Sequence, residues 1–157
     1  MTSKVYLETT IVSYLTARRS RDLIVAAHQQ ITEDWWENRR ENFDPYISEL
    51  VIREAGAGNK EAAHRRLEAL KDIPLLELTE ETFHLAMGLV EKGPIPEGAR
   101  EDALHIALAT VHGMDFLLTW NCRHIANAEM RAGVTAICVA RGYEAPVICT
   151  PEELMGE

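Results

Sequence analysis

Short β-prone runs alternate with longer stretches of helical periodicity along the whole chain. Strands are predicted at residues 4–7, 45–48, 75–78, 115–119, 135–139 and 147–149. Helices are predicted at residues 11–15, 22–40, 49–55, 60–71, 80–91, 100–112 and 125–131. Because strands and helices alternate, the pattern predicts an α/β fold with a parallel sheet covered by helices on both faces.

Some of these elements carry signals for their ends and their buried faces. A threonine after the first strand is expected to cap the first helix. The helix at 22–40 is expected to pack through one apolar stripe. Its residues are Leu23, Ala26, Ala27, Ile31 and Trp35. The segment 102–112 is apolar on nearly every side, so we expect it to be largely buried. Residues 150–153, Thr-Pro-Glu-Glu, fit a capping box with proline at the first helical position.

The length and charge of the chain limit its organisation and its partners. With 157 residues and no linker or repeat, residues 1–157 are expected to form one domain. The 16 Lys and Arg residues and 25 Asp and Glu residues give a net charge of −9. This charge excludes nucleic-acid binding by bulk positive charge, although a local basic groove remains compatible with it.

The cysteines and the N-terminal segment indicate the compartment. Cys122, Cys138 and Cys149 are odd in number and lack the CxxC spacing, which favours reduced thiols over a disulfide framework or a zinc site. No apolar leader precedes the first strand, and no apolar run reaches membrane-spanning length. We therefore expect a soluble, cytoplasmic protein.

Polar side chains follow several predicted strands at the point where each strand ends. Glu8 follows the first strand, and Thr119 and Asn121 lie at the end of the strand at 115–119. Asp102 opens the helix that precedes this strand. Because ligands in open α/β sheets bind beyond the carboxyl ends of the strands, these side chains are expected to gather at one rim.

Several of these residues also have a purely structural interpretation. Asp102 fits a helix N-terminus as well as a functional site, and its position does not choose between the two. Asn121 on its own fits a turn residue better than a ligand. The strand at 45–48 is followed by both Glu49 and Glu54, and five helical residues turn by about 140° past a full circle. The two glutamates therefore cannot face one site equally well, and helical geometry does not decide between them.

A rim of carboxylates suits a hard divalent cation. Mg²⁺ prefers oxygen ligands and is usually held by one or two carboxylates together with substrate phosphate. Such an ion would support hydrolysis of a phosphodiester, whereas acids alone would repel a phosphate backbone. No G-x-S-x-G, P-loop, G-x-G-x-x-G or H-E-x-x-H motif occurs. His105 lies three residues after Asp102 without a serine or cysteine nucleophile, and His124 completes no zinc pattern.

Four blocks of the sequence resemble the PIN-domain nucleases, many of which are ribonuclease toxins paired with antitoxins (VapC-like). The blocks span nearly the whole chain and are residues 5–10, 47–58, 102–107 and 117–121. Residues 147–154 also resemble the end of that domain. Each block is a weak motif, but their order and spacing together are fairly specific. The resemblance implies a three-layer α/β/α domain with a mostly parallel central sheet.

The resemblance also implies a metal-dependent acidic site that cuts RNA. Carried over by position, its three acids fall on Glu8, Glu54 and Asp102, which would hold Mg²⁺ or Mn²⁺, and its fourth polar position falls on Asn121, with Thr119 beside it. This favours Glu54 over Glu49. The chain departs from the family pattern at Glu8, where aspartate is usual, and at Asn121, which carries no charge.

These observations predict a Mg²⁺- or Mn²⁺-dependent endoribonuclease, with Asn121 and Thr119 orienting water or a substrate phosphate. The exposed arginines expected to contact the RNA backbone are Arg18, Arg19, Arg21 and Arg123. The main alternative is a catalytically weak or inactive module of the same fold that acts through protein or RNA binding. An unrelated α/β phosphohydrolase has less support, because Glu8 stands where such enzymes commonly need an aspartate nucleophile. An antitoxin partner is implied by the family, and a homodimer by the family together with apolar surface around Trp35 and Trp36.

Overall fold

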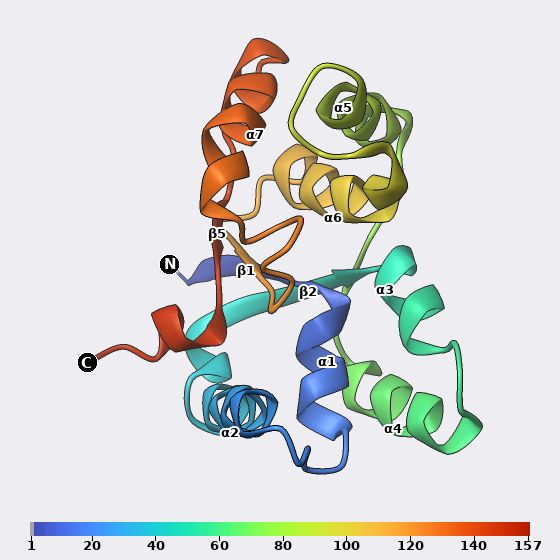
Figure 1. Cartoon of the computed structure of the whole chain (residues 1–157), viewed down its shortest axis with the longest axis vertical. Helices are drawn as coiled ribbons and strands as arrows, with labels where there is room; N and C mark the ends of the chain where they lie inside the picture. Colours follow the sequence, from blue (N-terminus) through green and yellow to red (C-terminus); the bar gives the residue numbers. More distant parts are fainter. Residues whose placement is uncertain (1) are drawn as a thin grey trace.

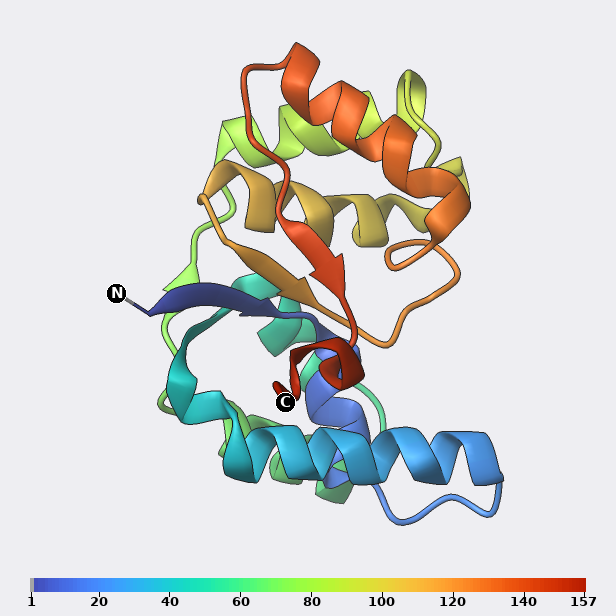
Figure 2. The ribbon, with the colours of Figure 1, turned by 90° about the vertical axis from the view of Figure 1, so that its left-hand side faces the viewer.

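A five-stranded, all-parallel sheet forms the centre of the computed structural model, which describes residues 2–157 (Figures 1 and 2). The strands lie in the order β3-β2-β1-β4-β5. Their bounds are β1 Ser3–Leu7, β2 Phe43–Ser48, β3 Leu75–Leu76, β4 Phe116–Leu118 and β5 Val147–Cys149. The prediction of an α/β fold with a parallel sheet is therefore confirmed.

Helices cover both faces of the sheet. On one face lie α1 (Thr9–Thr16), α2 (Leu23–Asn38), α3 (Glu49–Ala55) and α4 (Lys60–Leu70), and on the other lie α5 (Glu80–Glu91), α6 (Arg100–Val111) and α7 (Ala128–Ala140) (Figure 1). Three short 3₁₀ turns, Arg40–Asn42, Glu97–Ala99 and Pro151–Leu154, complete the regular structure of the described residues. The three-layer α/β/α arrangement is the one that the sequence predicted.

The strand order reverses at the centre of the sheet. From β1 the chain adds β2 and β3 on one side, and it then returns to place β4 and β5 on the other. At the carboxyl ends of β1 and β4, Leu7 lies beside Leu118, and the Glu8 N–H donates to the Leu118 carbonyl at 3.1 Å. A reversal of this kind opens a crevice beyond the strand ends, which is where ligands bind in open α/β sheets.

The core lies above and below β1 and around α6. Val5, Tyr6 and Leu7 are buried on both faces of the sheet, as expected for a central parallel strand. In α6, every residue from position 103 to position 110 is buried. This confirms the prediction for the apolar segment 102–112, because α6 lies between the sheet and the outer helix α5 (Figure 1).

The predictions for residues 125–139 were wrong. The predicted strand at 135–139 lies inside α7, and the predicted helix at 125–131 begins only at Ala128. Val134 and Cys138 of α7 are buried while Thr135 and Val139 are exposed, which is helical spacing. Its β-branched residues resemble a strand locally, but packing against α5 decides for a helix. The strand predicted at 147–149 is the observed β5.

The helix α2 begins where the sequence predicted, after Asp22, but the buried face near its start was predicted incorrectly. Leu23 is 86% exposed, whereas the buried residues of α2 include the polar Gln29 and Thr32 beside Trp35. The Gln29 amide donates to the Arg18 carbonyl at 3.0 Å and accepts from the Ser20 N–H at 2.8 Å. Gln29 is therefore buried because it satisfies the backbone of the loop between α1 and α2.

The remaining predictions concern the cysteines, the C-terminal capping box and membrane-spanning helices. All three cysteines are free; Cys138 and Cys149 are buried and Cys122 is exposed. The capping box at Thr150 is present, although it begins a 3₁₀ turn. None of the helices formed by residues 2–157 is long and apolar enough to cross a membrane.

Candidate functional site

The predicted site residues come from segments at the carboxyl edge of the sheet. Glu8 follows β1 directly and caps α1, a place where threonine was expected as the cap. Glu54 lies in the last turn of α3, the helix that follows β2, and Asp102 lies in the first turn of α6. Thr119 and Asn121 follow β4. The topology therefore brings the ends of four distant segments to the central crevice.

Glu8 is a buried carboxylate held through one of its two oxygens. The residue is only 4% exposed. Oε1 accepts hydrogen bonds from the Thr119 hydroxyl at 2.7 Å, from the Thr10 N–H at 3.1 Å and from the Thr10 hydroxyl. Oε2 receives no hydrogen bond from any described residue. The carboxylate is thus fixed, with one oxygen left for a ligand.

Glu54 is held in the same way. Oε1 accepts from the Thr9 hydroxyl and lies 2.7 Å from His105 Nε2. Burial raises the pKa of the Glu54 carboxyl, but the hydrogen bonds from His105 and from the hydroxyl of Thr9 leave the pKa below its usual value. Glu54 is therefore ionised at neutral pH, and its hydrogen bonds from described side chains go to Oε1 alone.

Glu8, Glu54 and His105 form a compact cluster. One oxygen or nitrogen from each of the three side chains lies within 4.8 Å of the other two. Within the part of the chain that the structure describes, neither Glu8 nor Glu54 has a lysine or arginine salt-bridge partner. Two carboxylates so close together, one buried and the other partly exposed, favour a positive charge between them.

Asp102 lies in a neighbouring part of the site and is not one of those three residues. Its Oδ2 is 3.0 Å from His124 Nδ1, and both side chains are 23% exposed. Asp102 lies in the first turn of α6, where the helix dipole stabilises its charge. Asp102 is thus an ionisable group at a helix N-terminus that also orients a histidine.

Thr119 and Asn121 have different surroundings. The Thr119 hydroxyl donates to Glu8 and accepts the Asn121 N–H at 2.9 Å. The Asn121 side-chain oxygen accepts the His124 N–H at 3.0 Å, as in the turn role that the sequence favoured. Thr119 is therefore positioned beside a carboxylate, while the Asn121 oxygen shapes the loop after β4.

Trp120 anchors that loop to the helices below the sheet. Its indole Nε1 donates to the Thr32 hydroxyl at 2.7 Å, and its backbone N–H donates to the Thr10 hydroxyl at 2.8 Å. The His28 ring stacks on the indole with centroids 4.0 Å apart. Because Thr10 and Thr119 both bond to Glu8, this anchor fixes the loop and the carboxylate together.

The sequence analysis set aside two histidines that the structure places in the site. His105 contacts Glu54 and His124 contacts Asp102. Two sequence signals were present: Asp102 and His105 share one face of a helix at i, i+3 spacing, and His105 is the one strongly polar residue in an apolar stretch. Glu49, in contrast, is exposed at the start of α3, away from the cluster that contains Glu54.

The donor set fits a hard divalent cation. Two carboxylates each present one oxygen without a protein hydrogen bond, and the third acid lies at a neighbouring helix start. Carboxylate oxygens at a partly hydrated site are the ligands that Mg²⁺ and Mn²⁺ take. The residues at this site are therefore compatible with the metal that the sequence predicted.

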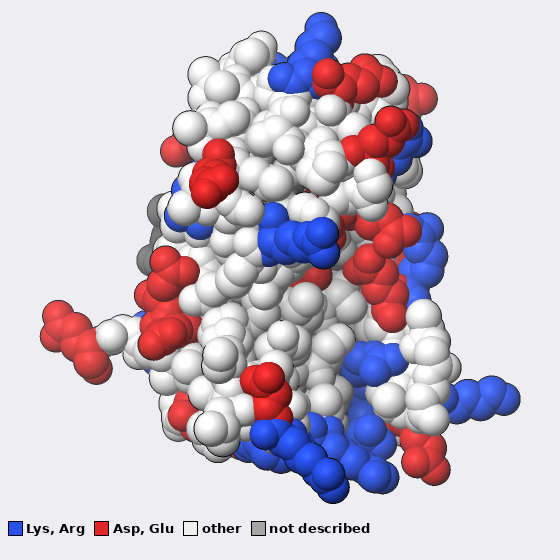
Figure 3. Space-filling view, viewed as in Figure 1, with Lys and Arg blue, Asp and Glu red and all other residues white. Residues whose placement is uncertain are grey.

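Acidic and basic side chains are spread over the face shown in Figure 3, with a local concentration of each sign. Acidic side chains gather near α3 and the start of α6, whereas basic side chains gather over the loop between α1 and α2. Arg18 and Arg21 in that loop and Arg123 after β4 are exposed, while Arg19 pairs with Glu33 at 3.0 Å. The net charge of −9 thus coexists with a local basic surface.

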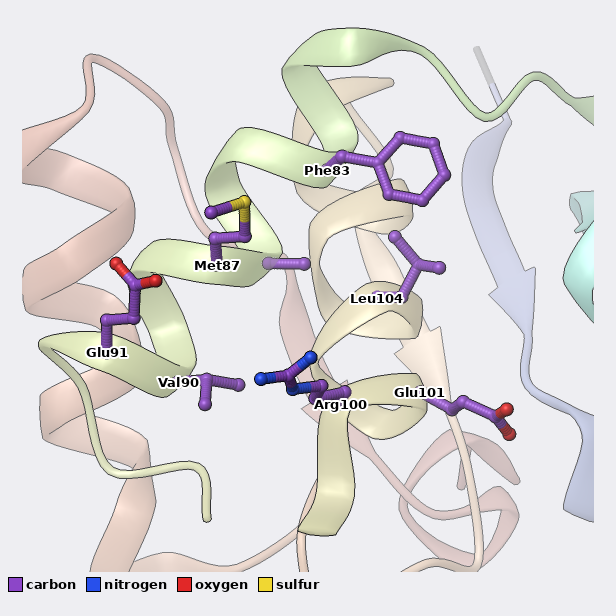
Figure 4. A pocket seen from close by; sticks show the side chains of 8 residues that line it. Phe83, Met87, Val90, Glu91, Arg100, Glu101 and Leu104 are labelled. Carbon is purple, nitrogen blue, oxygen red and sulfur yellow. The ribbon is translucent and has the colours of Figure 1, made fainter. Parts of the chain in front are cut away.

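An apolar groove between α5 and α6 is separate from the acidic cluster (Figure 4). Phe83, Met87, Val90 and Leu104 line it. The carboxylate of Glu101 at its edge points away from the groove.

The chain was compared with known families, proteins and structures. No protein-family model matches it. No curated protein matches it at a significant level. Among solved structures, a chain in the crystal structure of VapBC2 from Rickettsia felis, bound to a DNA fragment from the promoter of these proteins, is similar with a TM-score of 0.57 and 15% identity. The similarity covers 94% of this chain and 98% of that chain. The fold of this protein is therefore PIN-like, as its sequence blocks predicted. The carboxylates of Glu8 and Glu54 lie at the carboxyl edge of its sheet, where the strand order reverses.

Proposed function

We propose that this protein is a metal-dependent endoribonuclease that hydrolyses RNA phosphodiester bonds. The observation that carries the proposal is the pair Glu8 and Glu54, each held through Oε1 by hydroxyl, N–H or imidazole donors and each with no hydrogen bond to Oε2 from residues 2–157. The PIN-like fold and the similarity to a chain of the VapBC2 complex support the same function.

In this proposal Glu8, Glu54 and Asp102 hold Mg²⁺ or Mn²⁺ directly or through water. When bound there, a divalent cation would supply charge stabilisation at a phosphoryl group and would lower the pKa of a bound water. Thr119 keeps the Glu8 carboxylate in one orientation, because its hydroxyl donates to Oε1. The side-chain oxygen of Asn121 already accepts the His124 N–H. Its NH₂ group would donate to water or to a phosphate oxygen.

Basic side chains would bind the rest of the substrate. Arg18, Arg21 and Arg123 are exposed on loops, and the basic loop between α1 and α2 is separated from the acidic region in Figure 3. Arginine contacts to phosphates position a nucleic acid without reading its sequence. RNA would therefore extend from the acidic crevice toward this loop.

The test is cleavage of a mixed, end-labelled RNA pool with added Mn²⁺ and with EDTA. We expect Glu54→Gln and Asp102→Asn to lower the cleavage rate by about 100-fold or more, the scale of losing one well-placed electrostatic group. Glu49→Gln is the matched control, because Glu49 lies on the same helix but is exposed away from the cluster. Equal rates for wild type and Asp102→Asn, or cleavage that persists in EDTA, would contradict the proposal.

A catalytically weak module of the same fold is a second candidate. It is favoured by Asn121, which adds no negative charge and whose oxygen bonds within its own loop. Calorimetry without Mn²⁺ binding, together with tight RNA binding and no cleavage, would select this function.

We further propose an antitoxin protein as a partner, since the similar chain comes from a VapBC2 complex. Co-purification with the product of a small neighbouring reading frame would support it. The homodimer also stays a prediction, but Trp35 cannot contribute to it because its side chain is completely buried in the core.

A further inference from the structure

A chain of buried hydrogen bonds leads from the start of α3 to the carboxylate at its end. Ser48 Oγ lies 2.8 Å from the Tyr6 hydroxyl, and that hydroxyl lies 2.7 Å from His105 Nδ1. His105 Nε2 lies 2.7 Å from Glu54 Oε1. Ser48, Tyr6 and His105 are all fully buried. Because Ser48 caps the helix that carries Glu54, the bonds tie both ends of α3 to β1 and α6.

The donors and acceptors of this chain balance in only one direction. Ser48 Oγ already accepts the Val51 N–H at 3.3 Å, so its proton can be donated to Tyr6. Tyr6 then donates to His105 Nδ1, which places the imidazole proton on Nε2, and Nε2–H donates to Glu54. Burial raises the pKa of Tyr6 well above its usual value, and the charges of Glu8 and Glu54 raise it further, so the phenol keeps its proton.

The reverse direction leaves groups unsatisfied. A proton on Nδ1 alone would turn the Nε2 lone pair toward the Glu54 carboxylate at 2.7 Å, which is repulsive. It would also make Tyr6 donate to Ser48, whose own proton would then have no acceptor among the described residues. A buried hydroxyl without a partner is destabilising. A doubly protonated His105 would also make Tyr6 donate to Ser48, and the Ser48 proton would again have no acceptor among the described residues.

We propose that Ser48, Tyr6 and His105 are positioning residues that hold Glu54 with Oε1 toward the protein and Oε2 toward the crevice. Two donors on Oε1, His105 and Thr9, fix the plane of the carboxylate and therefore the place of the second oxygen. The use of Oε2 as a metal ligand rests on the proposed function, whereas the hydrogen-bond direction does not.

The direction is measured first, on the metal-free full chain. Nitrogen-15 NMR of the histidine side chains, with His105 assigned by its absence in His105→Gln, is expected to show the Nε2–H form in the wild type. Tyr6→Phe is expected to lose that preference, because Nδ1 loses its donor. Tyr46→Phe on neighbouring β2 is the matched control, since Tyr46 is half-buried and its hydroxyl has no hydrogen bond to a described residue, and it should leave the spectrum unchanged.

The second measurement is Mn²⁺ affinity by calorimetry. Tyr6→Phe and Ser48→Ala are expected to raise the Mn²⁺ Kd by about 10- to 100-fold, as loss of outer contacts to metal ligands does, while Tyr46→Phe stays at the wild-type value. His105→Gln keeps an N–H near Nε2 and is expected to bind Mn²⁺ more tightly than His105→Leu. Urea unfolding of each variant separates this effect from loss of the fold.

An Nδ1–H form in the wild type would overturn the proposed direction. Wild-type Mn²⁺ affinity in both folded Tyr6→Phe and His105→Leu would overturn the positioning role. If the wild type shows Nε2–H but binds no Mn²⁺ and cuts no RNA, the proposed function fails while the direction of the hydrogen bonds stands.

Discussion

Single hydroxyl groups decide how the acids of this site are oriented. Thr119 and Thr10 donate to Glu8, and Thr9 donates to Glu54. The Thr119 and Thr10 hydroxyls also accept backbone N–H groups, from Asn121 and Trp120. Because each of these two hydroxyls both accepts and donates, it connects rigid backbone to a carboxylate, and such chains strengthen one another in a buried site.

Replacing Thr119 with valine should therefore weaken both the fold and the proposed activity. We expect Thr119→Val to lower the free energy of unfolding by about 1–2 kcal/mol, because the buried Glu8 oxygen and the Asn121 N–H both lose a partner. The rate of RNA cleavage should fall by about 10- to 100-fold. Urea titration and single-turnover cleavage provide the two measurements.

Thr119→Ser keeps the hydroxyl and is the control. It should stay close to the wild type in both measurements. If valine and serine have the same effect, the methyl group and not the hydroxyl of Thr119 is what the site requires.

Thiol reactivity provides a second test at the residue scale. Burial, and next the charge of Glu153, raise the pKa of Cys149 to about 12, and burial raises the pKa of Cys138. A raised thiol pKa means that the reactive thiolate is scarce at pH 8, and the exposed Cys122 should react alone. We expect one fast equivalent with Ellman's reagent in native protein, none in Cys122→Ser, and three per chain in denaturant. A fast thiol remaining in Cys122→Ser would show that the core opens readily.

At the scale of elements, caps at the carboxyl edge connect local structure to the site. Glu8 caps α1 and Ser48 caps α3, and both also belong to hydrogen-bond networks around the carboxylates. A cap inside the site therefore cannot be changed without changing the site. Caps remote from it are different, and α2 provides one: the Asp22 side chain accepts the Ile24 N–H at 2.9 Å and the Val25 N–H at 3.0 Å.

Removal of this remote cap should alter stability but not chemistry. Asp22→Ala is expected to lower the free energy of unfolding by about 1 kcal/mol, because two N–H groups at the start of α2 lose their acceptor. Asp22→Asn keeps an acceptor oxygen and should lose only a few tenths of that. RNA cleavage per folded molecule should be unchanged in both. A fall in cleavage that exceeds the unfolded fraction would show that α2 contributes to the site.

At the scale of the whole molecule, a buried carboxylate, Glu8, and a partly buried one, Glu54, meet where the sheet reverses its order. Their mutual repulsion is opposed within the described chain by hydroxyl, amide and imidazole donors and not by lysine or arginine. A divalent cation that binds only the folded chain should therefore raise its stability by mass action.

Mn²⁺ at 100 times its Kd should raise the free energy of unfolding by about 2.7 kcal/mol. For a domain of this size, that corresponds to a rise in Tm of about 5–10 °C in a single transition. Glu54→Gln should show a smaller rise, and Glu49→Gln the full one. Differential scanning fluorimetry at matched ionic strength gives the comparison. An equal rise in Tm for the wild type and both variants would show that Mn²⁺ binds outside this site.

Much of this protein is determined by its sequence through local rules. Apolar periodicity and helix caps predicted the parallel α/β fold, and the buried helix around Asp102 follows from residues that are apolar on every side. The acids that follow strands could be named for the same reason, since parallel strands all end at one edge of a sheet.

Tertiary structure decided what local rules leave open. Residues 135–139 form helix and not strand because α7 packs on α5, and a β-branched run carries no information about that neighbour. His105 belongs to the site because β1 brings Tyr6 to its Nδ1 and α3 brings Glu54 to its Nε2. A hydrogen bond between residues 51 or 99 positions apart has no local signature in sequence. The orientation of each carboxylate, unlike its presence, therefore comes only from the folded chain.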